Sequence, residues 1–236
     1  MAIAFVNSVA IQALSAAATI TSPSFASTNG NFLAVNVGDN PDAVSSVTDS
    51  AGNTYTLAVG PTSTGAGTTL EQHYTTNIVG AAGHTVTAAL SPDSIATLWV
   101  LQASGIATTA PLDQVATDVD TGVTSFLSPA VTTTQADELL IGAFCHDGGT
   151  ATISAGGSFT LTNPQEDSCC IAGSAEYRIV AATGSYQSSF SYAGSATNAV
   201  NVFATYKAAA GGGRTTKNTR SHPLGVEIGM GWRMPV

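Results

Sequence analysis

The feature that most constrains the fold is a regular rhythm of short strand-like runs separated by turn signals. Runs rich in Val, Ile, Thr, Phe and Tyr recur along the chain, and groups of Gly, Asn, Asp, Ser and Pro interrupt them about every 8–12 residues. Such turn signals stand at 49–53, 80–83, 91–93 and 156–157. Long helices need Leu, Glu, Lys and Arg in quantity, and only 9% of these residues are charged. The sequence therefore predicts an all-β fold.

The same pattern predicts where the strands lie. We expect strands in the first half at 4–9, 17–21, 32–37, 44–48, 55–59, 70–77, 84–89 and 96–103. In the second half we expect them at 123–127, 139–144, 151–154, 159–163, 173–180, 186–192 and 200–207. Residues 105–135, which contain APLD and a run of threonines, are predicted to link the two halves.

The two halves resemble each other in sequence. In order along the chain, four pairs of segments match: NFLAVNV (31–37) with ELLIGAF (138–144), SAGNTYTL (50–57) with SAGGSFTL (154–161), HYTTNIVGAAG (73–83) with EYRIVAATG (176–184), and ATLWVLQASG (96–105) with NAVNVFATYKA (198–208). Four matches in the same order favour an internal duplication over chance. We therefore expect one domain, residues 1–210, with repeated halves at about 29–106 and 136–208. Its expected architecture is a jelly-roll-like antiparallel sandwich of about eight to twelve strands.

Four longer stretches carry a resemblance to a known kind of domain: VSSVTDSAGNTYTLAVGP (44–61), SGIATTAPLD (104–113), TTTQADELLIGAF (132–144) and AEYRIVAATGSYQSSFSY (175–192). They resemble a β-sandwich domain that recurs in tailed-phage structural proteins and in bacterial extracellular proteins. The resemblance covers about residues 3–208, and its motifs are turns, hairpins and core positions. It implies a sandwich with an exposed structural or adhesive role, and it brings no catalytic signature with it.

Charge divides the chain into two unequal parts. Residues 1–210 hold fourteen carboxylates against Arg178 and Lys207, a balance of −12, whereas residues 211–236 hold four basic residues against Glu227, a balance of +3. An acidic body repels nucleic acid and anionic membrane surfaces, so neither is an expected partner. The basic charges of the tail are too few to predict nucleic-acid binding.

The end of the chain has a strand pattern of its own. After the linker-like stretch 208–213, every second residue from Leu224 to Val236 is apolar, which is typical of an extended strand with one apolar face. We expect 211–236 to be an assembly arm that docks on a neighbouring subunit by strand addition. Folding back on its own sandwich and remaining unstructured stay open as alternatives. The predicted partner-binding residues are Leu224, Val226, Ile228, Met230, Trp232 and Met234, with Arg214, Lys217, Arg220 and Arg233.

Candidate catalytic groups are few. Glu71 and His73 share a face of a predicted strand and could bind a metal, but the sequence shows no third ligand. In Cys145-His146-Asp147, neighbours on a strand point to opposite faces, so Cys145 and His146 are not expected to act as a dyad. Both groups are better explained as ordinary strand and turn residues.

Paired aspartates are weak signals for calcium. Asp118 and Asp120 resemble half of a calcium loop but lack the further oxygen ligands, and Asp39 and Asp42 are typical of a turn. No nucleophile elbow and no phosphate-binding glycine loop occur. We therefore expect no enzymatic activity and no cofactor.

Aromatic and cysteine residues add little chemistry. Trp99 lies in an apolar run and is expected in the core, whereas Tyr186 and Tyr192 lie in a polar strand and are the candidates for a glycan-stacking platform. The odd number of cysteines without metal spacing predicts buried small apolar residues, namely Cys145, Cys169 and Cys170.

Residues 1–26 lack the basic beginning of a signal peptide and are interrupted by polar residues, so we expect opening strands there. The sequence has no run of about 18 apolar residues, so we expect no membrane-spanning segment.

The leading hypothesis is a structural virion protein, a tailed-phage capsid decoration or appendage protein on the virion exterior. Its partners would be capsid proteins or sister subunits in a homo-oligomer. The alternatives are a secreted carbohydrate-binding or adhesive module, which would bind a host-surface glycan, and a filament subunit that exchanges C-terminal strands.

Overall fold

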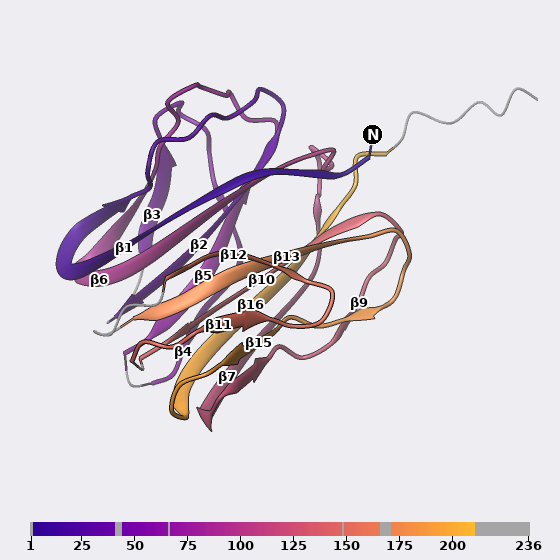
Figure 1. The fold of residues 1–236 in the computed structure, drawn as a ribbon. Helices are drawn as coiled ribbons and strands as arrows, with labels where there is room; N and C mark the ends of the chain where they lie inside the picture. Colours follow the sequence, from indigo (N-terminus) through magenta and orange to yellow (C-terminus); the bar gives the residue numbers. More distant parts are fainter. Residues whose placement is uncertain (1, 41–43, 66, 148, 166–170, 211–236) are drawn as a thin grey trace, which may run out of the picture.

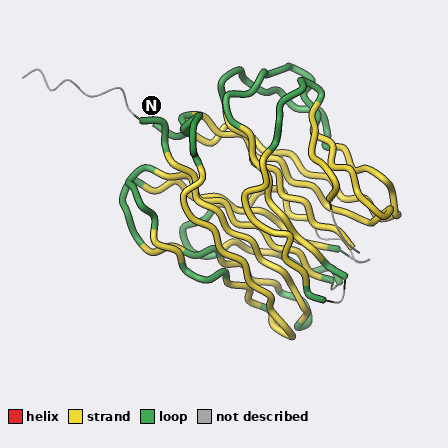
Figure 2. Tube along the Cα trace, turned by 180° about the vertical axis from the view of Figure 1, so that it is seen from behind, coloured by secondary structure: helices red, strands yellow, loops and turns green. Residues whose placement is uncertain are grey.

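The computed structural model describes residues 2–40, 44–65, 67–147, 149–165 and 171–210. Within these residues the chain is all β, and Figure 2 shows strands and loops with no helix. All the strand pairs of the sheets are antiparallel. The prediction of an antiparallel β-sandwich is confirmed for this part of the chain.

The first half of the chain forms one large sheet. Its strands are β1 (Ala4–Thr21), β2 (Phe32–Asn40), β3 (Val44–Asp49), β4 (Thr56–Ser63), β5 (Thr69–Thr75) and β6 (Val86–Ser104). They lie in the order β1-β6-β2-β5-β4, and β3 pairs with the beginning of β6. The long strands β1 and β6 run side by side along one edge of this half (Figure 1).

The second half forms another large sheet and two small ones. The large sheet contains β7 (Leu112–Val123), β10 (Glu138–His146), β12 (Thr160–Gln165), β13 (Ala172–Val180) and β16 (Thr197–Lys207), in the order β12-β13-β10-β16-β7. The strands β8 (Ser125–Leu127), β11 (Ile153–Ala155) and β15 (Ser189–Tyr192) form a sheet in the order β11-β15-β8, and β9 (Val131–Thr132) pairs with β14 (Ser185–Tyr186).

The two large sheets pack face to face around the main core. Phe32, Leu70 and Trp99 from the first sheet meet Ile141 and Tyr206 from the second, and all five side chains are buried. The sheets approach closely at Gly38, where an added Cβ would lie 2.1 Å from Cys145 Sγ. This apolar contact is the main contribution that holds the two halves together.

Each large sheet also has a covered outer face, which the sequence did not predict. In the first half, Leu33, Val35 and Leu98 of the outer face pack against Ile20 and Val86, from the end of β1 and the start of β6. In the second half, Phe144 packs in a cluster with residues of the small β11-β15-β8 sheet, namely Phe126, Ile153, Phe190 and Tyr192. Each half is therefore a small sandwich, and the two halves pack back to back.

The halves share their strand order and details of their hydrogen bonding. The order β1-β6-β2-β5-β4 repeats as β7-β16-β10-β13-β12. Ser22 N donates to Val86 O and Ser22 Oγ accepts from Val86 N, at 2.8 and 3.0 Å. Ser128 makes the same two bonds with Ser188, at 3.0 and 2.9 Å. This is the arrangement that a duplication would produce, although the duplication itself stays a prediction.

Several predictions of strand position are wrong. Segments 4–9 and 17–21 form the single strand β1, with register shifts near Ala13 and Ala17, and 84–89 and 96–103 likewise lie in β6, which starts at Val86. The predicted linker 105–135 contains β7, β8 and β9. Because β7 is an edge strand that carries Asp and Thr on half-exposed faces, it lacks the apolar alternation from which strands are predicted.

Candidate functional site

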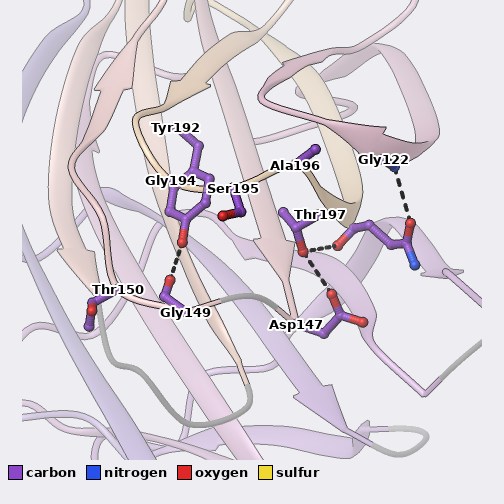
Figure 3. Close-up of a pocket in the computed structure, with 10 residues that line it drawn as sticks. Gly122, Asp147, Gly149, Thr150, Tyr192, Gly194, Ser195, Ala196 and Thr197 are labelled. Carbon is purple, nitrogen blue, oxygen red and sulfur yellow. Dashed lines mark hydrogen bonds between the residues drawn. The ribbon is translucent and has the colours of Figure 1, made fainter.

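A polar cleft opens at one end of the second half (Figure 3). The end of β7, the residues after β10 and the segment from the end of β15 to the start of β16 line it, and its volume is about 510 Å³. It is lined by Gly122, Asp147, Gly149, Thr150, Tyr192, Gly194, Ser195, Ala196, Thr197 and Asn198.

Hydrogen bonds join the segments that line the cleft. Thr197 Oγ1 donates to Asp147 Oδ1 at 2.8 Å, and Gly122 N donates to the side-chain oxygen of Asn198 at 3.2 Å. The hydroxyl of Tyr192 donates to Gly149 O, and its buried ring packs on His146 with 4.5 Å between centroids. The result is a concave surface of hydroxyl, amide and carboxylate groups, which is suited to hydrogen-bonding an uncharged polyhydroxyl ligand.

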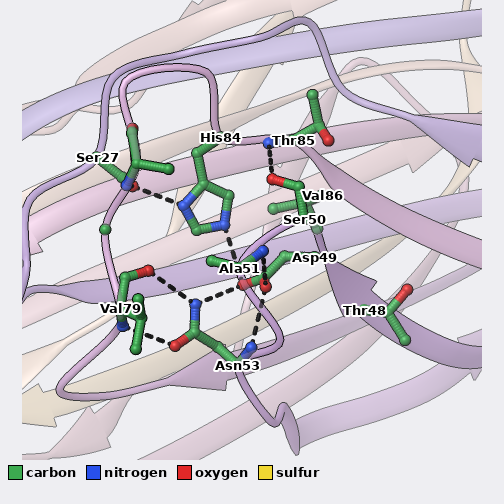
Figure 4. Close-up of polar contacts among 12 residues, drawn as sticks. Ser27, Thr48, Asp49, Ser50, Ala51, Asn53, Val79, His84, Thr85 and Val86 are labelled. Carbon is green, nitrogen blue, oxygen red and sulfur yellow. Dashed lines mark hydrogen bonds and ion pairs between the residues drawn. The ribbon is translucent and has the colours of Figure 1, made fainter.

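A second polar cluster surrounds Asp49 at the end of β3 (Figure 4). Asp49 Oδ1 accepts from the backbone N–H groups of Ala51 and Asn53, both at 3.0 Å. Asp49 Oδ2 accepts from Asn53 Nδ2 at 2.8 Å and from the Tyr55 hydroxyl at 2.9 Å. Burial raises the pKa of Asp49, but the hydrogen bonds from Asn53 and Tyr55 outweigh it and leave the pKa below its usual value.

The Asp49 cluster continues into a row of Ser, His and Asp. His84 Nε2 lies 3.0 Å from Asp49 Oδ2, and Ser27 Oγ lies 2.6 Å from His84 Nδ1 (Figure 4). The side chains of His84 and Asp49 are fully buried, and Phe25 stacks on the imidazole at 5.1 Å. Ser27 Oγ also accepts from Ala81 N at 2.9 Å. Ser27 is only half-buried, and its Oγ contacts both His84 and Ala81, so the row links the segment around Ser27 to residues 81–84.

The second half places apolar and aromatic groups where the first has this cluster. The matched motifs align Asp49, Asn53 and Tyr55 with Ile153, Gly157 and Phe159. The bridge between Phe25 and His84 has its counterpart in the pair of Val131 with Tyr186. Arg178 lies over the rings of Phe159 and Tyr186, at 6.0 and 5.2 Å. Polar groups occupy this position in the first half, and apolar and aromatic groups occupy it in the second. In both halves these groups connect the turn to the outer layer.

The candidate metal ligands do not assemble a site. Glu71 Oε1 lies 3.0 Å from His73 Nε2, as their shared face predicted. Asp118 and Asp120 are both on β7 and face the same side of it. Among the described residues, no group of three His, Cys, Asp or Glu side chains could hold a metal ion. Asp39 is buried in β2, and Asp42 lies outside the described residues.

Cys145 and His146 face opposite sides of β10, as predicted. Cys145 is buried in the core between the large sheets, where burial and the nearby Asp39 raise the pKa of its thiol. His146 packs in the outer layer against Phe144 and Tyr192. Burial lowers the pKa of His146 to about 4, although the charge of Asp147 opposes this effect, so the imidazole is neutral at physiological pH.

Two buried carboxyl groups were missed by the sequence analysis. Burial, with a smaller contribution from the neighbouring Asp113, raises the pKa of Glu138 to about 7. Asp113 is itself stabilised as the anion, because Thr134 N donates to it at 2.7 Å and Lys207 Nζ lies 3.5 Å away. Glu176 accepts from Ser189 N at 2.9 Å, yet burial raises its pKa to about 8. Nothing in the local sequence separates these residues from exposed glutamates.

The remaining predicted residues divide into three groups. Trp99 and Cys145 are buried in the main core, which confirms that prediction. Tyr192 is buried, and Arg178 lies over the ring of the half-buried Tyr186, so the prediction of an exposed glycan platform on Tyr192 is wrong. Outside the described residues lie Cys169, Cys170 and all the predicted partner-binding residues: Arg214, Lys217, Arg220, Leu224, Val226, Ile228, Met230, Trp232, Arg233 and Met234.

Comparison with known proteins found no protein-family model that matches the chain, and no significant match among curated proteins or solved structures. Within the described residues, no helix is long and apolar enough to cross a bilayer.

Proposed function

We propose that this chain is a structural subunit of a virus particle, a tailed-phage capsid decoration or appendage protein. In this proposal the acidic sandwich is displayed on the virion exterior. Residues 211–236 attach it to capsid proteins or to sister subunits, and the subunits form a homo-oligomer.

The observation that carries the proposal is the point at which the tail leaves the sandwich. After β16, Ala208 N donates to Asp137 O at 2.9 Å and Ala209 N donates to Gly105 O at 2.7 Å. The chain is thus held to the sandwich up to the residues that precede 211. From this fixed point follows a segment of opposite charge with seven alternating apolar residues, a composition that suits attachment to another protein.

The use of reactive side chains within the sandwich supports a structural role. His84 and Asp49 of the Ser27–His84–Asp49 row are buried, and Cys145 and His146 are packed on opposite faces of their strand. These groups connect turns and layers of the fold, and the charge balance of −12 over residues 1–210 disfavours nucleic acid as the partner.

The location is tested by labelling. Intact particles purified from a lysate are probed with an antibody raised against the full chain and examined by electron microscopy, with pre-immune serum as the control. We expect labels on the outer surface of undisrupted particles. Recovery of the chain only as free protein in the medium contradicts the virion assignment and favours the extracellular one.

The cleft of Figure 3 favours a second candidate function, the binding of a host-surface glycan. Its polar lining offers the side chains of Asp147 and Asn198 beside the hydroxyls of Thr150 and Ser195. A glycan array probed with the full chain should then give signals that are lost with Asn198→Ala. The matched control is Tyr186→Ala, which changes an aromatic residue outside the cleft and should leave the signals intact.

A further inference from the structure

The strand β7 leaves one long edge of the second sheet open. β7 has twelve residues and pairs with β16 on one side, and among the described residues no strand pairs with its other side. Proteins usually shield such an edge, because its free N–H and C=O groups accept a strand from another chain. Val115 and Val119 on β7 are 43% and 44% exposed, although both are apolar.

The two faces of β7 differ in character. Val115, Thr117 and Val119 are paired with Ala204, Val202 and Val200, which belong to the core between the large sheets. Directly paired residues share a face, so the row that includes the two valines extends the face of that core to the edge of the sheet. The opposite face of β7 carries Asp118 and Asp120.

The end of the chain has the complementary pattern. From Leu224 to Val236 one row is entirely apolar, and the other contains three glycines with Glu227, Arg233 and Pro235. A strand added to β7 with its apolar row beside Val115 and Val119 would place Arg233 on the same face as Asp118 and Asp120. A shift by one residue would reverse both matches, so the two patterns together define the face of the added strand.

We propose that residues 224–236 of a second copy of this chain add to the open edge of β7 as an antiparallel strand. This proposal rests on the proposed function, since it names the surface and the partner through which subunits assemble. Backbone hydrogen bonds to the free edge would supply affinity, and the matched rows of side chains would supply specificity.

The lengths of the segments favour a second copy over the chain's own tail. β16 ends beside the start of β7, because Tyr206 is paired with Leu112. To run antiparallel along β7, the chain's own tail would first have to travel the length of that strand, about 36 Å. The thirteen residues 211–223 reach about 43 Å when fully stretched, but a Gly-rich coil of that length spans only about 20 Å on average. A tail from a second copy avoids this stretching.

The test uses full-length variants in pairs. An edge variant carries Val115→Lys and Val119→Lys, and a tail variant carries Ile228→Lys and Trp232→Lys. The matched control is Val6→Lys on β1, whose valine is 43% exposed at the edge of the other large sheet. Masses are measured by light scattering after gel filtration, and folding is checked by circular dichroism.

We expect wild type and the Val6→Lys control to form oligomers, and each of the other variants alone to be monomeric. An equimolar mixture of the edge and tail variants should form a one-to-one heterodimer, because one supplies an intact tail and the other an intact edge. A mixture that stays monomeric overturns docking between copies. Oligomers of the edge variant equal to those of wild type overturn β7 as the surface but leave the proposed function standing, whereas a monomeric wild type contradicts the proposed function itself.

Hydrogen exchange provides a second measurement that does not depend on the edge variant folding. In the wild-type oligomer, the outward amides of β7 should exchange at least tenfold more slowly than in the tail variant, while the amides of β1 remain unchanged. Equal exchange along β7 in both proteins overturns the proposal.

Discussion

His84 and Asp49 form a buried contact, 3.0 Å between Nε2 and Oδ2, that ties the turn after β3 to the outer layer of the first half. Asp49→Ala removes the acceptor for Asn53 and Tyr55 and leaves buried donors without a partner. We expect the free energy of unfolding to fall by about 3 kcal/mol in urea denaturation. The control is Ile153→Val at the aligned position of the second half, which should cost only about 1 kcal/mol. Equal losses for both would contradict the role of the cluster.

The buried carboxyl of Glu176 predicts how stability depends on pH. Its pKa is raised in the folded chain to about 8 from 4.5, so the folded state binds more protons than the unfolded state between these values. The stabilisation from this group should therefore be fully present below pH 4.5 and be lost as the pH rises to 8, with a decrease of at most about 4 kcal/mol between pH 5 and 8. The Tm of Glu176→Gln, which mimics the protonated acid, should decrease less over this range. A wild-type Tm that rises from pH 5 to 8 would count against this prediction.

The close approach of the two large sheets predicts a compensating pair of substitutions. Gly38→Ala places a Cβ 2.1 Å from Cys145 Sγ, so it should destabilise the fold by about 2 kcal/mol through overpacking. Cys145→Ala removes that sulfur and should cost about 1 kcal/mol alone. The double variant should be more stable than Gly38→Ala. A double-mutant cycle with additive losses would show that the sheets do not meet at this point.

The sequence alone predicted features that depend on local pattern. The opposite orientations of Cys145 and His146 and the burial of Trp99 follow from strand alternation and from an apolar neighbourhood, and both are confirmed. Strand β7 was missed because edge position depends on which strands pair, and Asp and Thr residues on a half-exposed strand resemble a loop.

Contacts between segments that are distant in the chain could not be predicted from the sequence. Ser27 and His84 are 57 residues apart, and the bridge of Phe25 with His84 and the hydrogen bonds of Ser27 with Ala81 bring them together. Glu138 stands beside another acidic residue, Asp137, in the sequence, but the pairing of β10 with β13 and β16 buries it. Burial of a single charged residue inside a sheet depends on tertiary packing and leaves no pattern in the sequence.

The central claim, that this chain assembles through its last residues, is tested most directly by the mass of the full-length protein. Sedimentation velocity is run over a hundredfold range of concentration on the wild type and on the variant with Ile228→Lys and Trp232→Lys. We predict that the wild type sediments as multiples of the 23.6 kDa chain and that the variant stays at 23.6 kDa with an unchanged Tm. A wild-type protein that remains at 23.6 kDa throughout, or a variant that assembles equally well, contradicts the account.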